Sequence, residues 1–427
     1  MNKLGKKEPR MDTDEHGCDF LEKLLDGAEV EWKPLGEVAD IYGGLTGKSK
    51  KDFEDGNAKY ISYKNIFENI HIDFNDFSQV RVSENENQHD VRYGDVLFTG
   101  SSETAIEAGM SSAVTRGFQE EVYLNSFSFG VRFNKSITLI PEFSKYLFRS
   151  SFMRREIAKT ASGVTRFNIS KARFRKLLIP IPCPENPEKS LAIQAEIVRI
   201  LDTFTELTTE LTTELTTELT ARTKQYNYYR DQLLTFEDCA VTWKELGNVT
   251  EINTGQKPSE ILERATGFDY INAGTSRSGY SANSNCEGDI VTTPSRGQGG
   301  IGYVGYQKRP FWLGALCYKM KSKDKDFLIN KYLFYFLQSK RELLLGLKKE
   351  GGVPAVNKSD LAKLQIPVPS PTEQARIVAI LDKFDTLTHS ISEGLPREIE
   401  LRQKQYEYYR DLLLNFPKSE PQTEIVA

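Results

Sequence analysis

The sequence lacks the features of a membrane, secreted or metal-binding protein. Among its 427 residues no apolar run approaches the ~20 residues that span a bilayer. Its cysteines, Cys18, Cys183, Cys239, Cys286 and Cys317, are scattered and never spaced C-x-x-C, and its four histidines do not cluster with them. This pattern favours reduced thiols in a cytoplasm and argues against zinc. We therefore expect a soluble, cytoplasmic protein of two or three domains without a metal site.

Motifs for catalysis are missing as well. The segment YGGLTGKS at 42–49 is not a P-loop, because that motif needs glycine where Tyr42 stands. GQGGIG at 297–302 fits G-x-G-x-x-G, but the residues after it include Gly305 and Pro310 and predict a strand, so a glycine-rich hairpin is favoured over a dinucleotide site. There is no Pro-Pro pair of the kind found in amino-methyltransferase loops, and no nucleophile with a base and an orienting acid. We expect a non-catalytic chain.

A long internal duplication is present instead. QAEIVRILDTF and RTKQYNYYRDQLLTF, within 194–236, return 180 positions later as QARIVAILDKF and RQKQYEYYRDLLLNF, within 374–416. Shorter anchors also recur: EWKPLGEV at 31–38 and TWKELGNV at 242–249, KYLF at 145 and 331, and IPIP at 179–182 against IPVP at 366–369. The blocks between the anchors differ. The chain therefore alternates variable domains with fixed helices.

This organisation predicts an α+β fold with two mixed α/β domains, two long helices and internal pseudo-twofold symmetry. Strands are expected at 96–99 and 290–293, and a helix closing each domain at about 142–160 and 328–347. The predicted boundaries are a flexible N-terminal tail 1–17, domain 18–186, central helix 187–236, domain 237–370, distal helix 371–416 and C-terminal tail 417–427.

The repeated segments have helical periodicity. Apolar residues such as Ile193, Ile197, Ile200 and Phe204 recur at steps of three or four, and the second copy has the same stripe 180 positions later. A helix of this length runs to ~65 Å, too far for one domain to cover. We expect the two stripes to pack together as an antiparallel coiled coil.

The first helix contains four tandem copies of Thr-Glu-Leu-Thr at 205–220. They keep the helix soluble with one leucine per turn, and each copy advances it by ~6 Å and a net rotation of ~40°. That rotation is close to the ~35° between successive DNA base pairs, so the copy number could act as a ruler. In the second copy Gly394 and Pro396 predict a break.

Positive charge is concentrated locally although the net charge is −4. Residues 145–176 hold ten basic side chains against one acid, and residues 331–363 hold seven against three. A solvated helix face and a nucleic-acid surface both fit this pattern. In YYRD, which occurs twice, Tyr228, Arg230, Tyr408 and Arg410 fall off the apolar stripe and are candidates for docking another protein.

With this order of segments, the chain resembles the specificity subunits of type I restriction-modification systems. The Thr-Glu-Leu-Thr array, LEKLLDGAEVEWKPLGE and REIELRQKQYEYYRDLLL are similar to the type IC branch. The resemblance implies two target recognition domains that read a split, asymmetric sequence in double-stranded DNA across a helical spacer. It also implies docking of two methylation subunits, with restriction subunits joining through them. S-adenosylmethionine, ATP and magnesium are then expected on the partners and no cofactor on this chain.

Basic residues are the candidates for DNA contact, through phosphates or base edges. They are Lys48, Lys50, Lys51, Lys64, Arg149, Arg154, Arg155, Arg166, Lys171 and Arg173 in the first half, and Lys257, Arg277, Arg296, Lys308, Arg309, Lys348, Lys349 and Lys358 in the second. The alternative function is a non-catalytic coiled-coil scaffold with two protein-binding domains. Finally, EKLLDGAEVEW at 22–32 resembles DQLLTFEDCAVTW at 231–243, so we expect the chain ends to lie close together.

Overall fold

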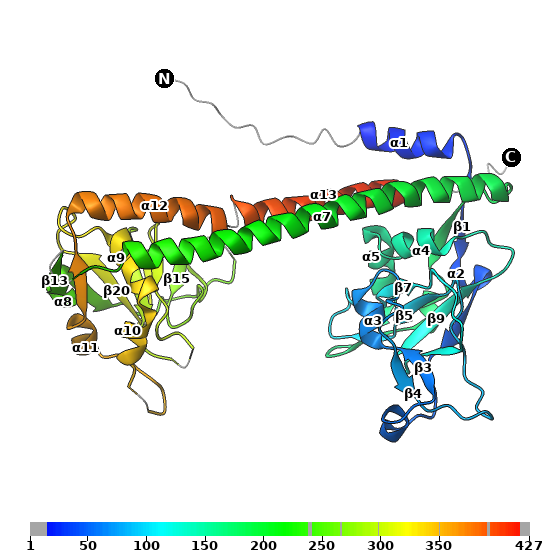
Figure 1. The fold of residues 1–427 in the computed structure, drawn as a ribbon, viewed down its shortest axis with the longest axis horizontal. Helices are drawn as coiled ribbons and strands as arrows, with labels where there is room; N and C mark the ends of the chain where they lie inside the picture. The colour runs from blue at the N-terminus through cyan, green and yellow to red at the C-terminus, as the bar shows by residue number, and fades with distance from the viewer. Residues whose placement is uncertain are drawn as a thin grey trace. The chain divides into compact units, whose positions relative to one another are not determined.

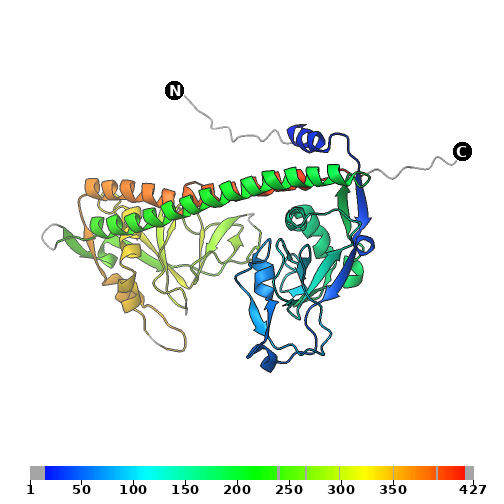
Figure 2. The same cartoon turned by 45° about the vertical axis from the view of Figure 1, so that its right-hand side comes forward.

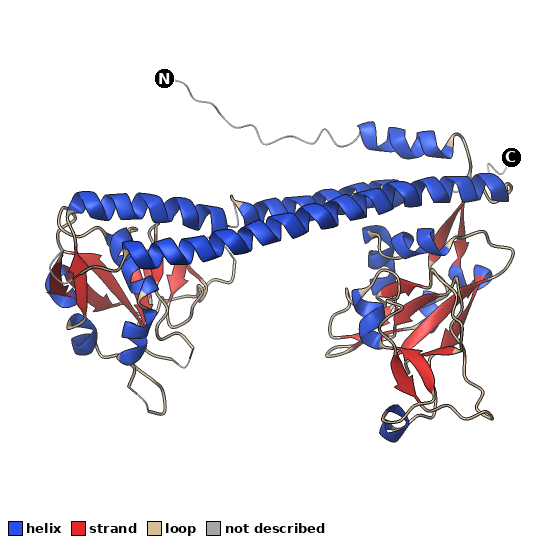
Figure 3. Cartoon of the chain, in the orientation of Figure 1, coloured by secondary structure: helices blue, strands red, loops and turns tan. Residues whose placement is uncertain are grey.

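The computed structural model describes residues 15–237, 241–264, 267–297, 299–349, 351–390 and 393–418. The chain divides into two compact units: unit 1 comprises 1–212 with 401–427, and unit 2 comprises 213–400. Within the described residues, no helix combines the length and apolar character needed to cross a bilayer. Each unit contains one mixed α/β domain, with its strands and short helices distinguished in Figure 3.

The domain of unit 1, domain 1, is built from short elements. These are α1 (Glu15–Leu25), β1 (Val30–Pro34), α2 (Leu35–Val38), β2 (Ala39–Gly43), η1 (Lys50–Phe53), β3 (Ala58–Ile61), α3 (Tyr63–Glu68), β4 (Ser78–Val80), β5 (Val96–Thr99), β6 (Ser101–Ser102), β7 (Ser111–Ala113), β8 (Val122–Leu124), β9 (Ser128–Phe133), α4 (Pro141–Leu147), α5 (Ser151–Lys159), β10 (Ala161–Ser162), β11 (Phe167–Ile169), α6 (Lys171–Phe174) and β12 (Leu178–Pro182).

The domain of unit 2, domain 2, repeats much of this order. Its elements are β13 (Thr242–Glu245), α8 (Leu246–Val249), β14 (Thr250–Thr254), β15 (Phe268–Ile271), β16 (Tyr280–Ser281), β17 (Ile290–Pro294), β18 (Gly305–Gln307), β19 (Trp312–Leu313), β20 (Cys317–Ser322), α9 (Asn330–Ser339), α10 (Arg341–Gly346), α11 (Lys358–Ala362) and β21 (Gln365–Val368). The fixed helices are α7 (Pro187–Leu233), α12 (Pro371–His389) and α13 (Leu395–Leu414). α7 is one unbroken helix in both ribbon views (Figures 1 and 2).

The two domains share their sheet topology, although little of their sequence aligns. The recurring anchors pair as antiparallel ribbons, with Trp32 opposite Pro180 and Trp243 opposite Pro367. The four-stranded sheets have the orders β2-β9-β5-β7 and β14-β20-β17-β18. The three-stranded sheets β4-β3-β8 and β16-β15-β19 each join a parallel and an antiparallel pair. The duplication therefore extends through the variable blocks.

A glutamine joins each fixed helix to its own domain. The Gln194 side chain accepts a hydrogen bond from the Ile140 N–H and donates one to the Thr138 carbonyl. Its counterpart, Gln374, accepts from the Ile329 N–H and donates to the Phe327 carbonyl. Both glutamines are fully buried, so this contact fixes the start of the fixed helix against the domain.

The fixed helices pack antiparallel in each unit, as the apolar stripes predicted. In unit 1 the ring of Phe204 on α7 stacks on Tyr409 of α13, with centroids 5.3 Å apart. In unit 2 the counterpart of Phe204, Phe384 on α12, stacks on Tyr229 of α7 at 5.9 Å. The offset of 180 residues relates Phe204 to Phe384 and Tyr229 to Tyr409, so each pair is the counterpart of the other. This relation is the pseudo-twofold symmetry expected from the sequence.

Several details of the helices differ from the prediction. The buried residues after Ile197 are Val198 and Leu201, whereas Ile200 is only partly buried, because a straight helix of 3.6 residues per turn drifts away from a strict repeat. Leu207, in the first Thr-Glu-Leu-Thr copy, is 55% exposed. Several threonine hydroxyls of the array donate to the carbonyl four residues earlier, as Thr209 does to the Thr205 carbonyl.

Element ends also differ from the predicted boundaries. Each closing helix is split, into α4 and α5 and into α9 and α10; α5 begins where the Ser150 hydroxyl accepts a hydrogen bond from the Met153 N–H. The expected break in the distal helix lies between α12 and α13, with Gly394 at a positive φ of 82° and Pro396 in the first turn of α13. The predicted tails extend outside the described residues at 1–14 and 419–427, and residues 15–17 are already helical.

The first and last described segments of the chain contact each other in unit 1, as the similarity of 22–32 to 231–243 suggested. Leu21 and Leu25 of α1 share a buried core with Leu413 and Leu414 of α13. The Trp32 indole N–H donates to the Pro417 carbonyl at 2.9 Å, across 385 positions of sequence. Domain 1 is therefore completed by segments from both ends of the described chain.

Candidate nucleic-acid interface

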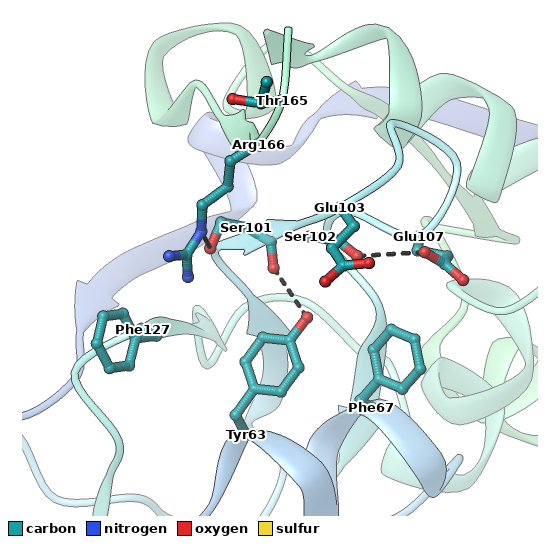
Figure 4. Close-up of a pocket in the computed structure, with 9 residues that line it drawn as sticks. All are labelled: Tyr63, Phe67, Ser101, Ser102, Glu103, Glu107, Phe127, Thr165 and Arg166. Atoms are coloured by element: carbon teal, nitrogen blue, oxygen red, sulfur yellow. Dashed lines mark hydrogen bonds between the residues drawn. The ribbon is translucent and has the colours of Figure 1, made fainter. Parts of the chain in front are cut away.

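A cleft of about 650 Å³ opens on one edge of domain 1 (Figure 4). Four separate segments line it: α3, β6 with the turn that follows, the turn before β9, and the hairpin between β10 and β11. The lining residues are Tyr63, Phe67, Ser101, Ser102, Glu103, Glu107, Phe127, Thr165 and Arg166. The cleft therefore combines aromatic rings with one basic and two acidic side chains.

Arg166 is held at this cleft by its Nε, which donates to the Ser101 hydroxyl at 3.1 Å. Its guanidinium lies over the ring of Phe127, 5.8 Å from the centroid. Phe127 is 63% exposed, which is unusual for a phenylalanine and marks an apolar surface available to a partner. Backbone bonds fix this turn, since the Phe127 carbonyl accepts the Gly100 N–H at 2.7 Å.

The two carboxylates of the cleft differ in their contacts. Glu107 accepts hydrogen bonds from the hydroxyls of Thr104, at 2.7 Å, and Ser102, at 3.4 Å. Glu103 is exposed and has no hydrogen bond or ion pair within the described residues. The cleft therefore presents both a hydrogen-bond donor and a hydrogen-bond acceptor to solvent, which is the combination that base edges require.

Many of the predicted DNA contacts are exposed basic side chains. Those with no ion pair or side-chain hydrogen bond among the described residues are Lys50, Lys51, Arg155, Lys171, Lys257, Arg296, Lys308 and Arg309. Lys64 is also exposed, with Glu68 at 3.9 Å. Such surface pairs contribute little to stability and are easily exchanged for a phosphate. These positions remain predictions for DNA contact.

Three predicted DNA contacts instead support domain 1. Arg149 donates to the carbonyls of Ser111, Ile66, Phe67 and Asn69. Burial, reinforced by the charges of Arg154 and Arg410, lowers the Arg149 pKa to about 10. These four bonds come from Nε and one terminal nitrogen and hold the largely buried guanidinium against the backbone of domain 1, so the contacts of Arg149 within the structure are structural.

Arg154 and Lys48 have similar roles. Arg154 donates to the carbonyls of Gly109, Ile106 and Ala108, and burial lowers its pKa to about 10. The ammonium of Lys48 is covered and binds Glu86 and the Arg81 carbonyl. The charged groups of Arg154 and Lys48 are thus engaged in bonds within domain 1, and a DNA contact of either residue stays a prediction.

The remaining candidates are bonded but lie near the surface. Arg173 donates to the Ala161 carbonyl at 3.3 Å, and Arg277 pairs with Asp269 at 3.1 Å. Lys349 pairs with Asp360 at 2.8 Å, and Lys358 donates to the Asn253 side chain at 3.1 Å. Lys348 is half-buried. Among the described residues, no group of three or more His, Cys, Asp or Glu side chains is arranged to hold a metal ion.

Comparison with known proteins identifies the family. The model of the type I restriction modification DNA specificity domain matches residues 28–221 and 240–401. The specificity subunit of the type I restriction enzyme EcoR124I/EcoR124II of Escherichia coli is 36% identical over 440 residues, covering 94% of this chain and 98% of that protein. The chain belongs to the family of type I restriction-modification specificity subunits. A second specificity subunit, that of EcoprrI from Escherichia coli, is 34% identical and covers 88% of this chain and 92% of that protein.

Solved specificity-subunit structures have the same fold. A chain from a study of assembly and conformational transition of a type I system aligns with a TM-score of 0.63 at 18% identity, covering 90% of this chain and 97% of that one. The HsdS subunit from Thermoanaerobacter tengcongensis aligns with a TM-score of 0.51 at 17% identity, covering 90% and 95%. As a specificity subunit, this chain is the non-catalytic, DNA-recognising component of a restriction-modification complex.

The predicted docking residues of this specificity subunit have unequal exposure. Tyr228 is 58% exposed on α7, while Tyr408 is half-buried beside Tyr409. Arg230 is largely covered and pairs with Asp231, and Arg410 is covered and donates to the Ser151 hydroxyl. Tyr228 is thus the most accessible of the four, and Arg410 connects α13 to α5 of domain 1.

The cleft residues other than Arg166 were not predicted from the sequence. Tyr63, Phe67, Glu103 and Phe127 come from segments spread over more than sixty positions, and no motif connects them. Only the fold brings these side chains together.

Proposed function

We propose that the two domains of this specificity subunit read the two halves of a split, asymmetric sequence in double-stranded DNA, and that the paired helices set the unread gap. The observation that carries the proposal is the duplication: one topology and one helix joint occur twice, while the exposed edges of the two domains differ. Two copies of one reader with different surfaces fit two different half-sites.

The proposed partners are two methylation subunits, which dock on the helices near surfaces such as Tyr228, and restriction subunits that join through them. S-adenosylmethionine, ATP and magnesium belong to those partners in this proposal, and residence in the cytoplasm follows from where they act. The scaffold alternative lacks support, because the family is defined by DNA specificity.

The test is to reconstitute the complex with its methylation subunits and map methylated sites in a random DNA library. A bipartite motif with a fixed gap is expected, and a continuous motif or no motif would contradict the proposal. Arg155→Ala should reduce the slope of log affinity against log salt by roughly 0.9, the contribution of one phosphate contact. An unchanged slope would remove Arg155 from the interface.

The ruler hypothesis has its own test. Deleting one Thr-Glu-Leu-Thr copy from 205–220 shortens α7 by ~6 Å and rotates its far end by ~40°. We expect the unread gap to shorten by about one base pair while both half-sites are retained. A library of copy-number variants whose gap never changes would contradict this hypothesis.

A further inference from the structure

Both domains place an arginine on the same edge, although from different strands. In domain 1, Asn168 pairs with Ser162 on one side and Ser101 on the other. In domain 2, Ala355 forms bridges to Lys349 and to Arg296. Arg296 therefore occupies the place of Ser101.

The register also locates the counterpart of Arg166. Five residues separate Ser162 from Asn168, and five separate Lys349 from Ala355, so the two hairpins have equal length. Counting from either end, Val353 occupies the place of Arg166. At this pair of neighbouring positions domain 1 has Ser101 and Arg166, whereas domain 2 has Arg296 and Val353.

The surroundings of this edge are also shared. The Gly100 N–H donates to the carbonyl of exposed Phe127, and the Ser295 N–H donates to the carbonyl of exposed Leu316 at 2.9 Å. Each domain therefore presents one arginine beside one exposed apolar side chain, on a turn fixed by backbone hydrogen bonds.

The geometry points to Arg166 and Arg296 as equivalent readers of a guanine, one in each half-site. This inference rests on the proposed function, because it assigns side chains to the reading of base edges. The Nε of Arg166 is oriented by Ser101, and its two terminal nitrogens have no partner among the described residues. A guanidinium fork with both ends free matches the O6 and N7 acceptors of guanine in the major groove.

Arg296 meets the same requirement in domain 2. Its side chain is exposed and makes no hydrogen bond or ion pair with the described residues. The other cleft feature of domain 1, unpartnered Glu103, accepts hydrogen bonds and suits the exocyclic amino group of cytosine or adenine. Domain 1 therefore has a donor and an acceptor for neighbouring base pairs, next to an apolar ring.

The test uses the complete complex with the substitutions Arg166→Lys and Arg296→Lys, which keep the charge but remove the fork. Methylated sites are mapped in a random library. Arg166→Lys should reduce discrimination at one G·C pair of one half-site by roughly 10- to 100-fold, and Arg296→Lys should do so only in the other half-site. The untouched half-site is the internal control, and Arg81→Lys, far in sequence and paired with Asp55, is the external one.

Two results would overturn the assignment: weaker methylation at all sites with unchanged base preference, which indicates a phosphate contact, or no change at all. If the complex without substitutions methylated no bipartite motif, the proposed function itself would be overturned. Failure of the guanine assignment and failure of the proposed function are therefore distinguishable. Glu103→Gln provides a variant that should fold normally, since Glu103 makes no hydrogen bond or ion pair within the described residues. It should alter base preference in the half-site affected by Arg166→Lys, and an unchanged preference there places the reading surface elsewhere.

Discussion

The joints between helix and domain are alike in the two units, whereas the edges that carry Arg166 and Arg296 place the arginine on different segments. At both joints a buried glutamine bonds the backbone before α4 or α9. Beyond it, an aspartate accepts from one lysine and one tyrosine: Asp202 from Lys145 and Tyr146, and Asp382 from Lys331 and Tyr335. The duplicated copies have kept the contacts that position the domains and changed the surfaces that face a partner.

The tyrosines at these joints come from different positions of the recurring KYLF anchor. Tyr146 lies within the anchor, and Tyr335 lies one residue after it, where unit 1 has Arg149. Burial raises the pKa of both tyrosines above the ordinary value, and the bond to the aspartate raises it further. Both hydroxyls are therefore protonated donors at any physiological pH. The contact is conserved even where the position of the residue is not.

The largest effect is expected at the position after KYLF, where the two units differ: unit 1 has Arg149 and unit 2 has Tyr335. Arg149→Met leaves four carbonyls of domain 1 without their donor, and we expect it to destabilise unit 1 by roughly 3 kcal/mol or more. Unit 2, with Tyr335 there, should be unaffected. Hydrogen–deuterium exchange separates the amides of the two units, and Arg155→Met is the exposed control. Equal exchange in both variants would contradict the structural role of Arg149.

A matched pair of substitutions sharpens the comparison of the joints. Gln194→Met and Gln374→Met each leave a partly buried N–H and a partly buried carbonyl without their partner, so each should destabilise its own unit by about 1–2 kcal/mol. The expected result is two similar losses, each confined to one unit in hydrogen exchange. If one substitution were tolerated and the other not, the two joints would not be equivalent.

A smaller effect distinguishes the two anchor tryptophans. Trp32→Phe removes the hydrogen bond to Pro417 and should destabilise unit 1 by about 1 kcal/mol. Trp243 is 38% exposed and donates no hydrogen bond within the described residues, so Trp243→Phe should have less than half that effect. Urea denaturation of both variants provides the measurement. Equal losses in the two variants would show that the hydrogen bond from Trp32 to Pro417 adds no stability beyond that of ring packing.

The smallest effect depends on pH and tests the reassignment of Lys48. Hydrogen bonds from Lys48 and then Gln88 lower the Glu86 pKa from 4.5 to about 2. A carboxyl with a depressed folded-state pKa stabilises the fold above pH 4.5, and this stabilisation is lost as the pH falls toward 2. The Tm gap between the wild type and Glu86→Gln should therefore be present at neutral pH and narrow on acidification below about pH 4.5. A gap independent of pH would contradict the ion pair.

Regular features of the fold followed from the sequence because they depend on local pattern. The helical period gave the antiparallel pairing, Gly394 and Pro396 gave the break, and the Trp and Ile-Pro anchors pair as ribbons. The internal contacts of Arg149 and Arg154 could not be predicted, because their carbonyl partners lie 38 to 83 positions away in the sequence. The equivalence of Arg166 and Arg296 required strand register, which the divergent blocks do not reveal.

The core of unit 1 has a consequence for the order in which a newly made chain can fold. Leu413, Leu414 and Phe416 complete the core that Val30, Leu35 and their neighbours begin. Unit 2 is continuous at 213–400, so it can assemble as soon as it leaves the ribosome. Domain 1 is synthesised first, but its core is complete only after unit 2 and then Leu413, Leu414 and Phe416 have been synthesised. Translation halted before residue 413 should thus release a protein whose second domain is native and whose first is open to proteases.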